Sequence, residues 1–192
     1  MKNRKTLGET FTGKNREAIP NIAFHIMTVM MKLMDFLGSQ SSKNFKTLGL
    51  KQGQTVIDYG CGPARYIQAA SNTVGKSGRV IAVDIHPLAI GKVKEKIEKY
   101  QLTNVEAVLA EKYNTSIIPG TADVVYALDM FHMIEQPNEF TKELSRLVKR
   151  DGIVIIEDGH QPRSETIKKI ARSGVLKVIQ ETKFHVKCKK II

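Results

Sequence analysis

The chain has 192 residues, of which 42% are apolar and 26% are charged. These values are ordinary for a globular domain, and the length is enough to bury a core without a metal or a disulfide. They exclude a disordered or collagen-like chain, and no apolar run reaches the roughly 18 residues of a transmembrane helix. The cysteines Cys61 and Cys188 are too few and too distant for a disulfide framework or a CxxC metal site. We therefore predict reduced thiols, no metal site and a cytoplasmic location.

The net charge of +11 is concentrated at the two ends of the chain. Residues 1–19 carry five Lys/Arg and two Glu, giving +3, and residues 160–192 carry nine Lys/Arg and two Glu, giving +7. Such ends can attract phosphates or an anionic membrane surface. A solvated lysine-rich surface explains the same charges, and it is the interpretation we favour.

Residues 22–37 form the first predicted element, with twelve apolar residues out of sixteen. The four exceptions fall at spacings of three, four and three, which is one narrow stripe of a helix: His25, Thr28, Lys32 and Asp35. Four methionines supply much of the remaining surface, and methionine adapts to irregular shapes. The stretch starts late and lacks a small-residue cleavage site, so it is a poor signal peptide. It predicts a helix packed against a sheet, a lid over an apolar substrate pocket, or an interface.

Short β-rich runs then alternate with helical patterns, which is typical of a parallel sheet with crossover helices. The predicted strands cover residues 55–58, 79–84, 105–109, 122–128 and 153–157. The first predicted crossover helix covers residues 64–72, and the next begins at Pro87 and has a buried stripe. This stripe consists of Ile90, Val93, Ile97 and Tyr100. Two more helices are predicted from Pro137 to near Gly152 and over residues 166–172. The C-terminal residues change to a period of two and predict a hairpin, in which Phe184, Val186 and Cys188 share one face.

The segment that joins the first predicted strand to its helix contains the strongest chemical signal. Asp58 and Tyr59 lead into Gly60-Cys61-Gly62, where a glycine loop lets the backbone and a helix N-terminus approach an anion or a nucleotide. Asp84 ends the second predicted strand, 22 residues after Gly62. A carboxylate at that position lies beside the loop and can accept hydrogen bonds from both hydroxyls of a ribose. The pattern predicts a nucleoside-bearing ligand at the carboxyl ends of the strands.

Three other nucleotide sites lack residues that they require. A P-loop needs GxxxxGK[ST], but Ala70 stands where its first glycine belongs. A dinucleotide-binding loop needs GxGxxG, and Arg65 takes the position of the third glycine. No tyrosine is followed four residues later by lysine, so the Tyr-x-x-x-Lys pair of short-chain dehydrogenases is missing.

These residues resemble the class I S-adenosylmethionine-dependent methyltransferases, closest to the ubiquinone/menaquinone-type and "type 11" group. Residues 58–62 resemble their motif I, Asp84 their ribose-binding acid, and residues 123–132 and 144–152 their fourth strand and the helix before the fifth. The likeness covers about residues 45–192 and implies a seven-stranded, Rossmann-like, doubly wound α/β sheet. Its strands would be mostly parallel, with a C-terminal antiparallel hairpin. Residues 1–44 would add an N-terminal basic segment and the apolar helix.

The resemblance implies S-adenosylmethionine (SAM) as cofactor and S-adenosylhomocysteine as product. Its cofactor-binding residues would be Asp58, Gly60, Cys61, Gly62, Asp84, Ile85, Ala110, Glu111 and Leu128. Two positions depart from the family pattern. Ala64 replaces the third motif I glycine, and Glu111 with Lys112 stands where an aspartate usually lies near the adenine amino group. Only residues 158–161 separate the fifth strand from its helix, so the insertion often found there is missing.

In such an enzyme the protein positions and desolvates the nucleophile, and a base is needed only for a protonated acceptor. The candidate catalytic residues are Asp129, His132 and His160, with Glu157 and Asp158 also expected at the carboxyl ends of strands four and five. A surface or capping role is the alternative for each of them. Cys61 is interpreted as a small loop residue and not as a nucleophile, since no basic group is evidently paired with it.

The sequence therefore predicts a methyltransferase that acts on a small, partly apolar acceptor, held between the strand ends and the helix at residues 22–37. An RNA methyltransferase that uses the basic ends is an alternative. It is less favoured because strand four ends in Leu128-Asp129-Met130-Phe131, without the Pro-Pro-aromatic motif of many nucleic-acid enzymes. A SAM-binding regulatory protein without catalysis is a further alternative.

Overall fold

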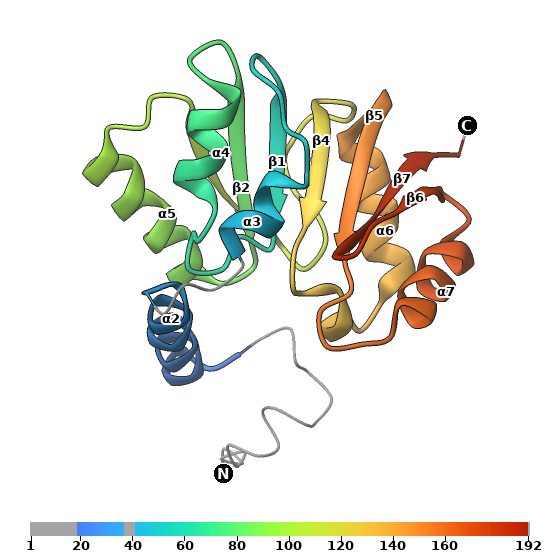
Figure 1. The fold of residues 1–192 in the computed structure, drawn as a ribbon, viewed down its shortest axis with the longest axis horizontal. Coiled ribbons are helices and arrows are strands. Elements are labelled where there is room, and N and C mark those ends of the chain that lie inside the picture. Colours follow the sequence, from blue (N-terminus) through green and yellow to red (C-terminus); the bar gives the residue numbers. More distant parts are fainter. Residues whose placement is uncertain (1–18, 37–40, 192) are drawn as a thin grey trace.

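The computed structural model describes residues 19–36 and 41–191, so the predicted basic segment at residues 1–18 and the predicted helix end at Leu37 lie outside the described residues. Seven strands form one sheet in the order β3-β2-β1-β4-β5-β7-β6 (Figure 1). Strands β1 to β5 pair in parallel, and β7 pairs antiparallel with both β5 and β6. The predicted fold class is confirmed. The strands are β1 (Thr55–Tyr59), β2 (Arg79–Asp84), β3 (Val105–Leu109), β4 (Ala122–Ala127), β5 (Val148–Glu157), β6 (Leu176–Glu181) and β7 (His185–Lys190).

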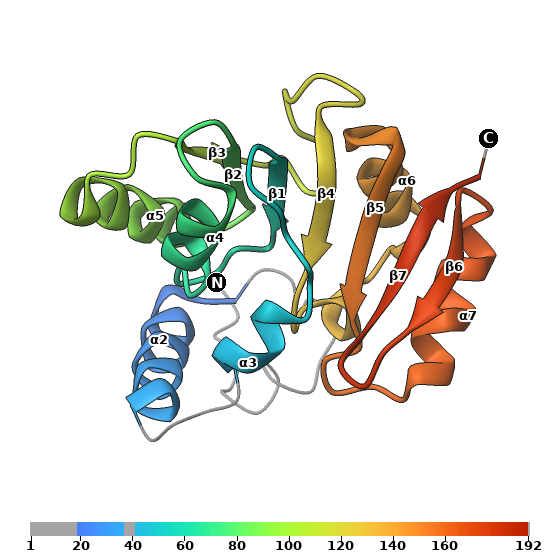
Figure 2. The same cartoon turned by 45° about the horizontal axis from the view of Figure 1, so that its top comes forward.

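Helices cover both faces of this sheet (Figures 1 and 2). They are α3 (Ser41–Lys46), α4 (Ile67–Val74), α5 (Pro87–Tyr100), α6 (Pro137–Leu147) and α7 (Arg163–Ser173). A further helix, α2 (Asn21–Phe36), and a short 3₁₀ turn, η1 (Phe131–Met133), complete the described elements. One core contains residues of α3, α4 and α5, and the other contains residues of α6 and α7. Neighbouring residues of β1 point into opposite cores, Val56 into the first and Ile57 into the second. Burial on both faces explains why the central strands are continuously apolar.

Two predicted helix boundaries are wrong. The first crossover helix begins at Ile67 and not at Ala64, because Ala64 has a φ of +62°, which is left-handed and not helical. The helix predicted to run to Gly152 ends at Leu147, because Val148 already pairs with Ala122 of β4. Gly152 lies within β5 beside an irregularity in the β4–β5 register, and a Cβ there would lie 2.8 Å from the Asp123 carbonyl oxygen. This glycine permits close backbone approach and does not end a helix.

Burial differs from the predicted patterns in α5 and in the hairpin. Ile90 and Val93 are buried and Ile97 is partly buried, but Tyr100 is 39% exposed at the C-terminal end of α5. In β7, Val186 and Cys188 are buried on one face as predicted. His185, expected to alternate with them, is also buried, because β7 is an interior strand between β5 and β6.

Helix α2 lies beyond the carboxyl ends of the strands, on the side toward which the arrowheads of β4 and β5 point (Figures 1 and 2). The Phe24 ring stacks on His86 with a centroid distance of 4.7 Å, and His86 Nε2 lies 3.1 Å from the Ile19 carbonyl oxygen. Thr28, one member of the predicted polar stripe, is buried and donates its hydroxyl to the Phe24 carbonyl oxygen. The helix therefore does not cover a face of the sheet. No helix among the described residues is long and apolar enough to cross a membrane.

Candidate cofactor and acceptor site

The glycine loop after β1 is fixed to β2 through its backbone. The N–H groups of Gly60 and Cys61 both donate to the Val83 carbonyl oxygen, at 2.8 and 3.0 Å. Gly60 has a φ of +83°, and a Cβ there would lie 3.0 Å from Met130 Cε, so glycine is required by both backbone and space. Gly62 differs, since among the described residues no heavy atom beyond its own chain neighbours lies within 4 Å of the place where its Cβ would be. The loop thus presents an open backbone surface at Gly62, where a ligand can approach closely.

Asp84 joins the end of β2 to this loop. Its Oδ2 accepts a hydrogen bond from the Gly62 N–H at 2.8 Å, and its Oδ1 accepts one from the His86 N–H at 2.8 Å. Burial raises the pKa of the Asp84 carboxyl, and the two N–H donors act in the opposite direction by stabilising the charged form. The structure therefore brings together the two features that the sequence singled out, and it orients the carboxylate through backbone groups.

Asp58 is the buried acid of the site, with only 2% of its surface exposed. Burial and the negative charge of Asp84 raise its pKa to about 8, although the hydroxyl of its cross-strand neighbour Tyr126 acts to lower it. Among the described residues, no hydrogen-bond partner of normal geometry reaches Asp58 Oδ2 or the Tyr126 hydroxyl. A buried carboxylate oxygen without a donor is costly, so a ligand that brings a donor or a positive charge would be stabilised here.

The residues predicted to hold the adenine end lie after β3. Ala110 is buried, and its N–H donates to the Asp84 carbonyl oxygen at 2.9 Å. Glu111 is exposed and exchanges backbone hydrogen bonds with Asn114, so its side chain lies at the rim. Ile85 and Leu128 are partly buried against the two cores at the same edge of the sheet.

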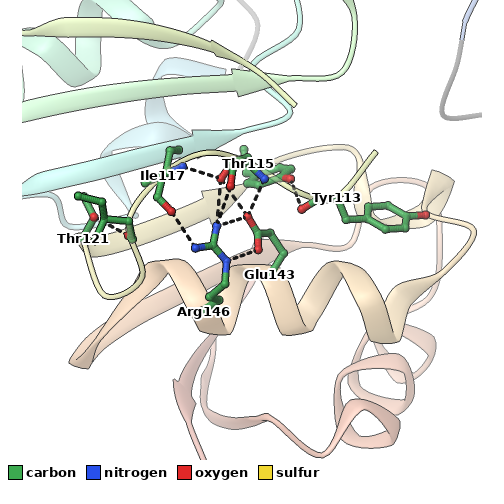
Figure 3. A network of polar contacts seen from close by, with 8 residues as sticks. Tyr113, Thr115, Ile117, Thr121, Glu143 and Arg146 are labelled. Carbon is green, nitrogen blue, oxygen red and sulfur yellow. Dashed lines mark hydrogen bonds and ion pairs between the residues drawn. The ribbon is translucent and has the colours of Figure 1, made fainter. Parts of the chain in front are cut away.

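A polar network that the sequence analysis missed anchors the chain between β3 and β4 to α6 (Figure 3). Arg146 donates to the carbonyl oxygens of Ile117 at 2.7 Å and Thr115 at 3.2 Å. Glu143 is 5% exposed, pairs with Arg146 at 2.6 Å, and accepts hydrogen bonds from the backbone N–H and the hydroxyl of Thr115. The Tyr59 hydroxyl adds a bond to the Tyr113 carbonyl oxygen at 2.8 Å. The i, i+3 spacing of Glu143 and Arg146 was the available signal, but it did not reveal their common target.

The ends of β4 and β5 bring two predicted catalytic candidates together. The rings of His132, in η1, and His160, after β5, have centroids 5.0 Å apart and meet edge to face. Gly159 has a φ of +63°, and a Cβ there would lie 2.1 Å from His132 Nδ1. The absence of a side chain at Gly159 therefore lets the two histidines approach.

The remaining candidates have structural contacts of their own. Asp129 is exposed and has a φ of +52°. Its charge raises the pKa of Glu157, whereas a hydrogen bond from its backbone N–H lowers that pKa. Burial, followed by the charge of Asp129, raises the pKa of Glu157. Asp158 forms a paired contact with Arg163, with Nε–Oδ distances of 2.9 and 2.8 Å, and so anchors the start of α7. Burial raises the pKa of the Cys61 thiol well above its ordinary value, which fits a small loop residue better than a nucleophile.

Comparisons with known proteins agree with this geometry. The sequence model of a family described as "Methyltransferase domain" matches residues 50–188. The chain belongs to this methyltransferase family. A crystal structure of a SAM-dependent methyltransferase from Aquifex aeolicus is 27% identical, with a TM-score of 0.67, over 78% of this chain and 89% of that one. A TehB-like SAM-dependent methyltransferase from Corynebacterium glutamicum shares the fold, with a TM-score of 0.70 and 13% identity, over 90% of this chain and all of that one.

The methyltransferase is also similar to a curated relative, a demethylmenaquinone methyltransferase of Bacillus cereus (strain AH187). The two are 27% identical over 120 residues, which are 62% of this chain and 51% of the relative. The chain therefore spans about half the length of the curated relatives that it matches. Together with the fold, these findings place it among the class I SAM-dependent methyltransferases, an enzyme family whose cofactor is SAM. The open backbone at Gly62 and the unpartnered oxygen of Asp58 fit such a ligand.

Proposed function

We propose that this methyltransferase transfers the methyl group of SAM to a small, partly apolar acceptor at the carboxyl ends of β4 and β5. The observation that carries the proposal is the pair Asp58 and Asp84 around an open glycine loop, one acid with an unpartnered buried oxygen and the other fixed by two backbone N–H groups. Bound SAM would supply an electrophilic methyl on a sulfonium centre.

On the cofactor side, each acid would have a distinct role. Asp84 would accept hydrogen bonds from the ribose hydroxyls, because its orientation is already set by the N–H groups of Gly62 and His86. Asp58 would hold the cationic amino group of the methionine moiety, which supplies the charge and the donors that its buried Oδ2 lacks. Ala110, Ile85 and Leu128 would surround the base with apolar surface, and Glu111 would close the rim.

On the acceptor side, the His132–His160 pair supplies two imidazole rings, the side-chain type that most often transfers protons in enzymes near neutral pH. We propose that His132 removes the proton from an acceptor hydroxyl or related group, with His160 and Gly159 setting its position. Met130 would help to shield the nucleophile from water. The name of the curated relative supports a quinone-type acceptor, which is one example of this class.

The test is methyl transfer from radiolabelled SAM to two matched pools, a set of lipophilic phenols and hydroquinones and a set of tRNA-sized RNAs. We expect label in the first pool, and we expect Asp84→Ala to lower it at SAM concentrations near the Kd of the unaltered protein. Label in RNA that persists at physiological salt would overturn the acceptor class and support the RNA alternative. Tight SAM binding without transfer to any acceptor would instead support the regulatory alternative.

A further inference from the structure

We propose that α2 docks the protein onto an anionic lipid bilayer, with its outward apolar face lying in the interface. Five large apolar side chains of this helix are 47% to 71% exposed: Ile22, Ile26, Val29, Met30 and Leu33. They are spaced by four, three, one and three residues, so they share one face of the helix. Soluble monomers rarely leave such a contiguous apolar face in water, and one that they do leave usually marks an interaction site.

Tertiary contacts fix which face points outward. Ala23, Phe24 and Thr28 are buried, and the Phe24 ring stacks on His86 at the start of α5. The opposite side of the helix is therefore already used for packing against the methyltransferase body. His25 and Lys32 are exposed along one border of the apolar face, which gives the helix the arrangement of an interfacial helix, apolar on the outside with basic groups beside it.

The distribution of charge along the chain favours an anionic bilayer as the partner of the exposed apolar face of α2. Residues 1–51 carry nine Lys/Arg and three Asp/Glu, a balance of +6, whereas residues 52–162 carry twelve Lys/Arg and fourteen Asp/Glu, a balance of −2. The positive charge is thus concentrated at the two ends of the chain, since residues 163–192 carry nine Lys/Arg and two Asp/Glu, a balance of +7. The N-terminal one of these two basic regions contains α2, and the exposed Lys32 and Lys46 belong to it. A second copy of the chain is disfavoured on the same face, because each copy carries a net charge of +11.

The length of α2 is consistent with a helix that lies on a bilayer. Its sixteen residues extend about 24 Å at about 1.5 Å per residue, less than the roughly 30 Å of a hydrocarbon core. Because α2 lies beyond the carboxyl ends of the strands, docking would bring the site's open edge toward the lipid (Figure 1). The inference stands on the exposed face and the charge, and does not require the proposed acceptor.

The experiment is co-sedimentation of the full chain with vesicles of phosphatidylcholine alone or mixed with phosphatidylglycerol. We expect binding to the anionic vesicles only, weakened several-fold between low and physiological salt. The double variant Ile26→Glu/Leu33→Glu should reduce the partition coefficient at least about tenfold, because it removes two apolar side chains and adds two negative charges. The matched control Ile118→Glu/Ile179→Glu alters two exposed apolar residues elsewhere, 76% and 49% exposed, and should stay within about twofold.

Other results would overturn the inference. Equal binding by both double variants, or no binding to anionic vesicles by the unaltered chain, would show that α2 is not the membrane contact. A dimer in light scattering that the α2 variant dissociates would assign the face to a second copy. Cooperative melting at similar temperatures for both variants is required for the comparison, and single variants Ile26→Gln and Leu33→Gln provide the milder test if a double variant does not fold.

Discussion

The proposed cofactor side and the proposed acceptor side of this methyltransferase are built in different ways. On the cofactor side, the loop at residues 60–62 and the acid Asp84 are fastened by backbone hydrogen bonds to Val83, Gly62 and His86. On the proposed acceptor side, His132 and His160 follow the ends of β4 and β5 and their rings meet edge to face, while Phe24 of α2 stacks on His86.

This difference has a functional consequence. A site made from backbone groups is preorganised and tolerates little change in geometry, which suits a cofactor that is the same in every member of a family. A site made from loop side chains and a lightly attached helix can change its lining without disturbing the sheet. The fold would therefore fix the proposed cofactor site more closely than the proposed acceptor site.

The largest expected effect is on the acceptor side. His132→Phe should lower kcat about 100-fold or more if His132 is the base, while the Kd of SAM stays within about twofold. Single-turnover transfer and calorimetry measure the two quantities. His160→Phe tests the positioning role of His160 and should lower kcat less than His132→Phe does. An unchanged kcat for His132→Phe would remove the proposed base.

Variants of the Glu143–Arg146 ion pair test how much this network, which anchors the chain between β3 and β4 to α6, contributes to stability. Arg146→Met leaves the carboxylate of Glu143 buried without its cation, and should lower the free energy of unfolding by about 2 kcal/mol. This is less than a fully buried ion pair would lose, because Arg146 is one-third exposed and its charge is partly screened by water. The double variant Glu143→Leu/Arg146→Met should recover part of this loss, since it removes the buried charge. Urea unfolding measures both. A double variant that is no more stable than Arg146→Met would contradict this account.

Asp84→Ala should weaken SAM binding at least about tenfold, because it removes hydrogen bonds to a charged group and releases the N–H groups of Gly62 and His86. Asp84→Asn should lose less, since its carbonyl oxygen can still accept one of those bonds. Calorimetry with melting curves checks both variants. Unchanged affinity in a folded Asp84→Ala protein would exclude the ribose role, and a large rise of the melting temperature with NADH or ATP would contradict the choice of cofactor.

Asp58 should make stability and SAM affinity depend on pH in opposite directions. Its pKa is raised from 3.8 to about 8, so between these values the folded protein holds a proton that the unfolded chain has lost, and the free energy of unfolding falls as pH rises. SAM affinity should rise several-fold over the same range, because the ionised carboxylate binds the amino group. Asp58→Asn should remove both dependences.

The measurements are best made between pH 6.5 and 8. His185 has a pKa lowered to about 4, chiefly by burial, so it contributes the opposite slope between about pH 4 and 6.5. The difference in the free energy of unfolding between the unaltered protein and Asp58→Asn separates the effect of this carboxyl group from the effects of other groups with shifted pKa values. A difference that does not change with pH would show that Asp58 is ionised throughout.

The smallest effect concerns Ala64, whose φ of +62° is normally adopted by glycine. Ala64→Gly relieves backbone strain of about 1 kcal/mol but removes a buried methyl group, so stability should change by less than about 1 kcal/mol. Ala70→Gly is the control, because Ala70 is equally buried within α4 and should lose about 1 kcal/mol more. Equal losses in urea unfolding would show that the loop stores no strain.

The sequence was sufficient for the features that depend on neighbouring residues. The alternation of strands and helices, the glycine loop, Asp58 and Asp84 were all predicted, because successive parallel strands place their carboxyl ends at one edge of the sheet. The predicted helix boundaries were wrong where one residue type is compatible with two different local structures. Gly152 matches a helix end in the sequence but serves close strand contact in β5, and Ala64 matches a helix start but has a left-handed backbone.

Only the tertiary structure decided which distant residues meet. The approach of His132 to His160 depends on the backbone of Gly159, and the partners of Glu143 and Arg146 lie about 30 residues earlier in the chain. The stacking of Phe24 on His86 determined which face of α2 points outward. The polar stripe in the sequence did not predict this orientation. Local periodicity determines which segments fold into helices and strands, whereas the direction in which a lightly attached helix faces is determined by the few long-range contacts that hold it.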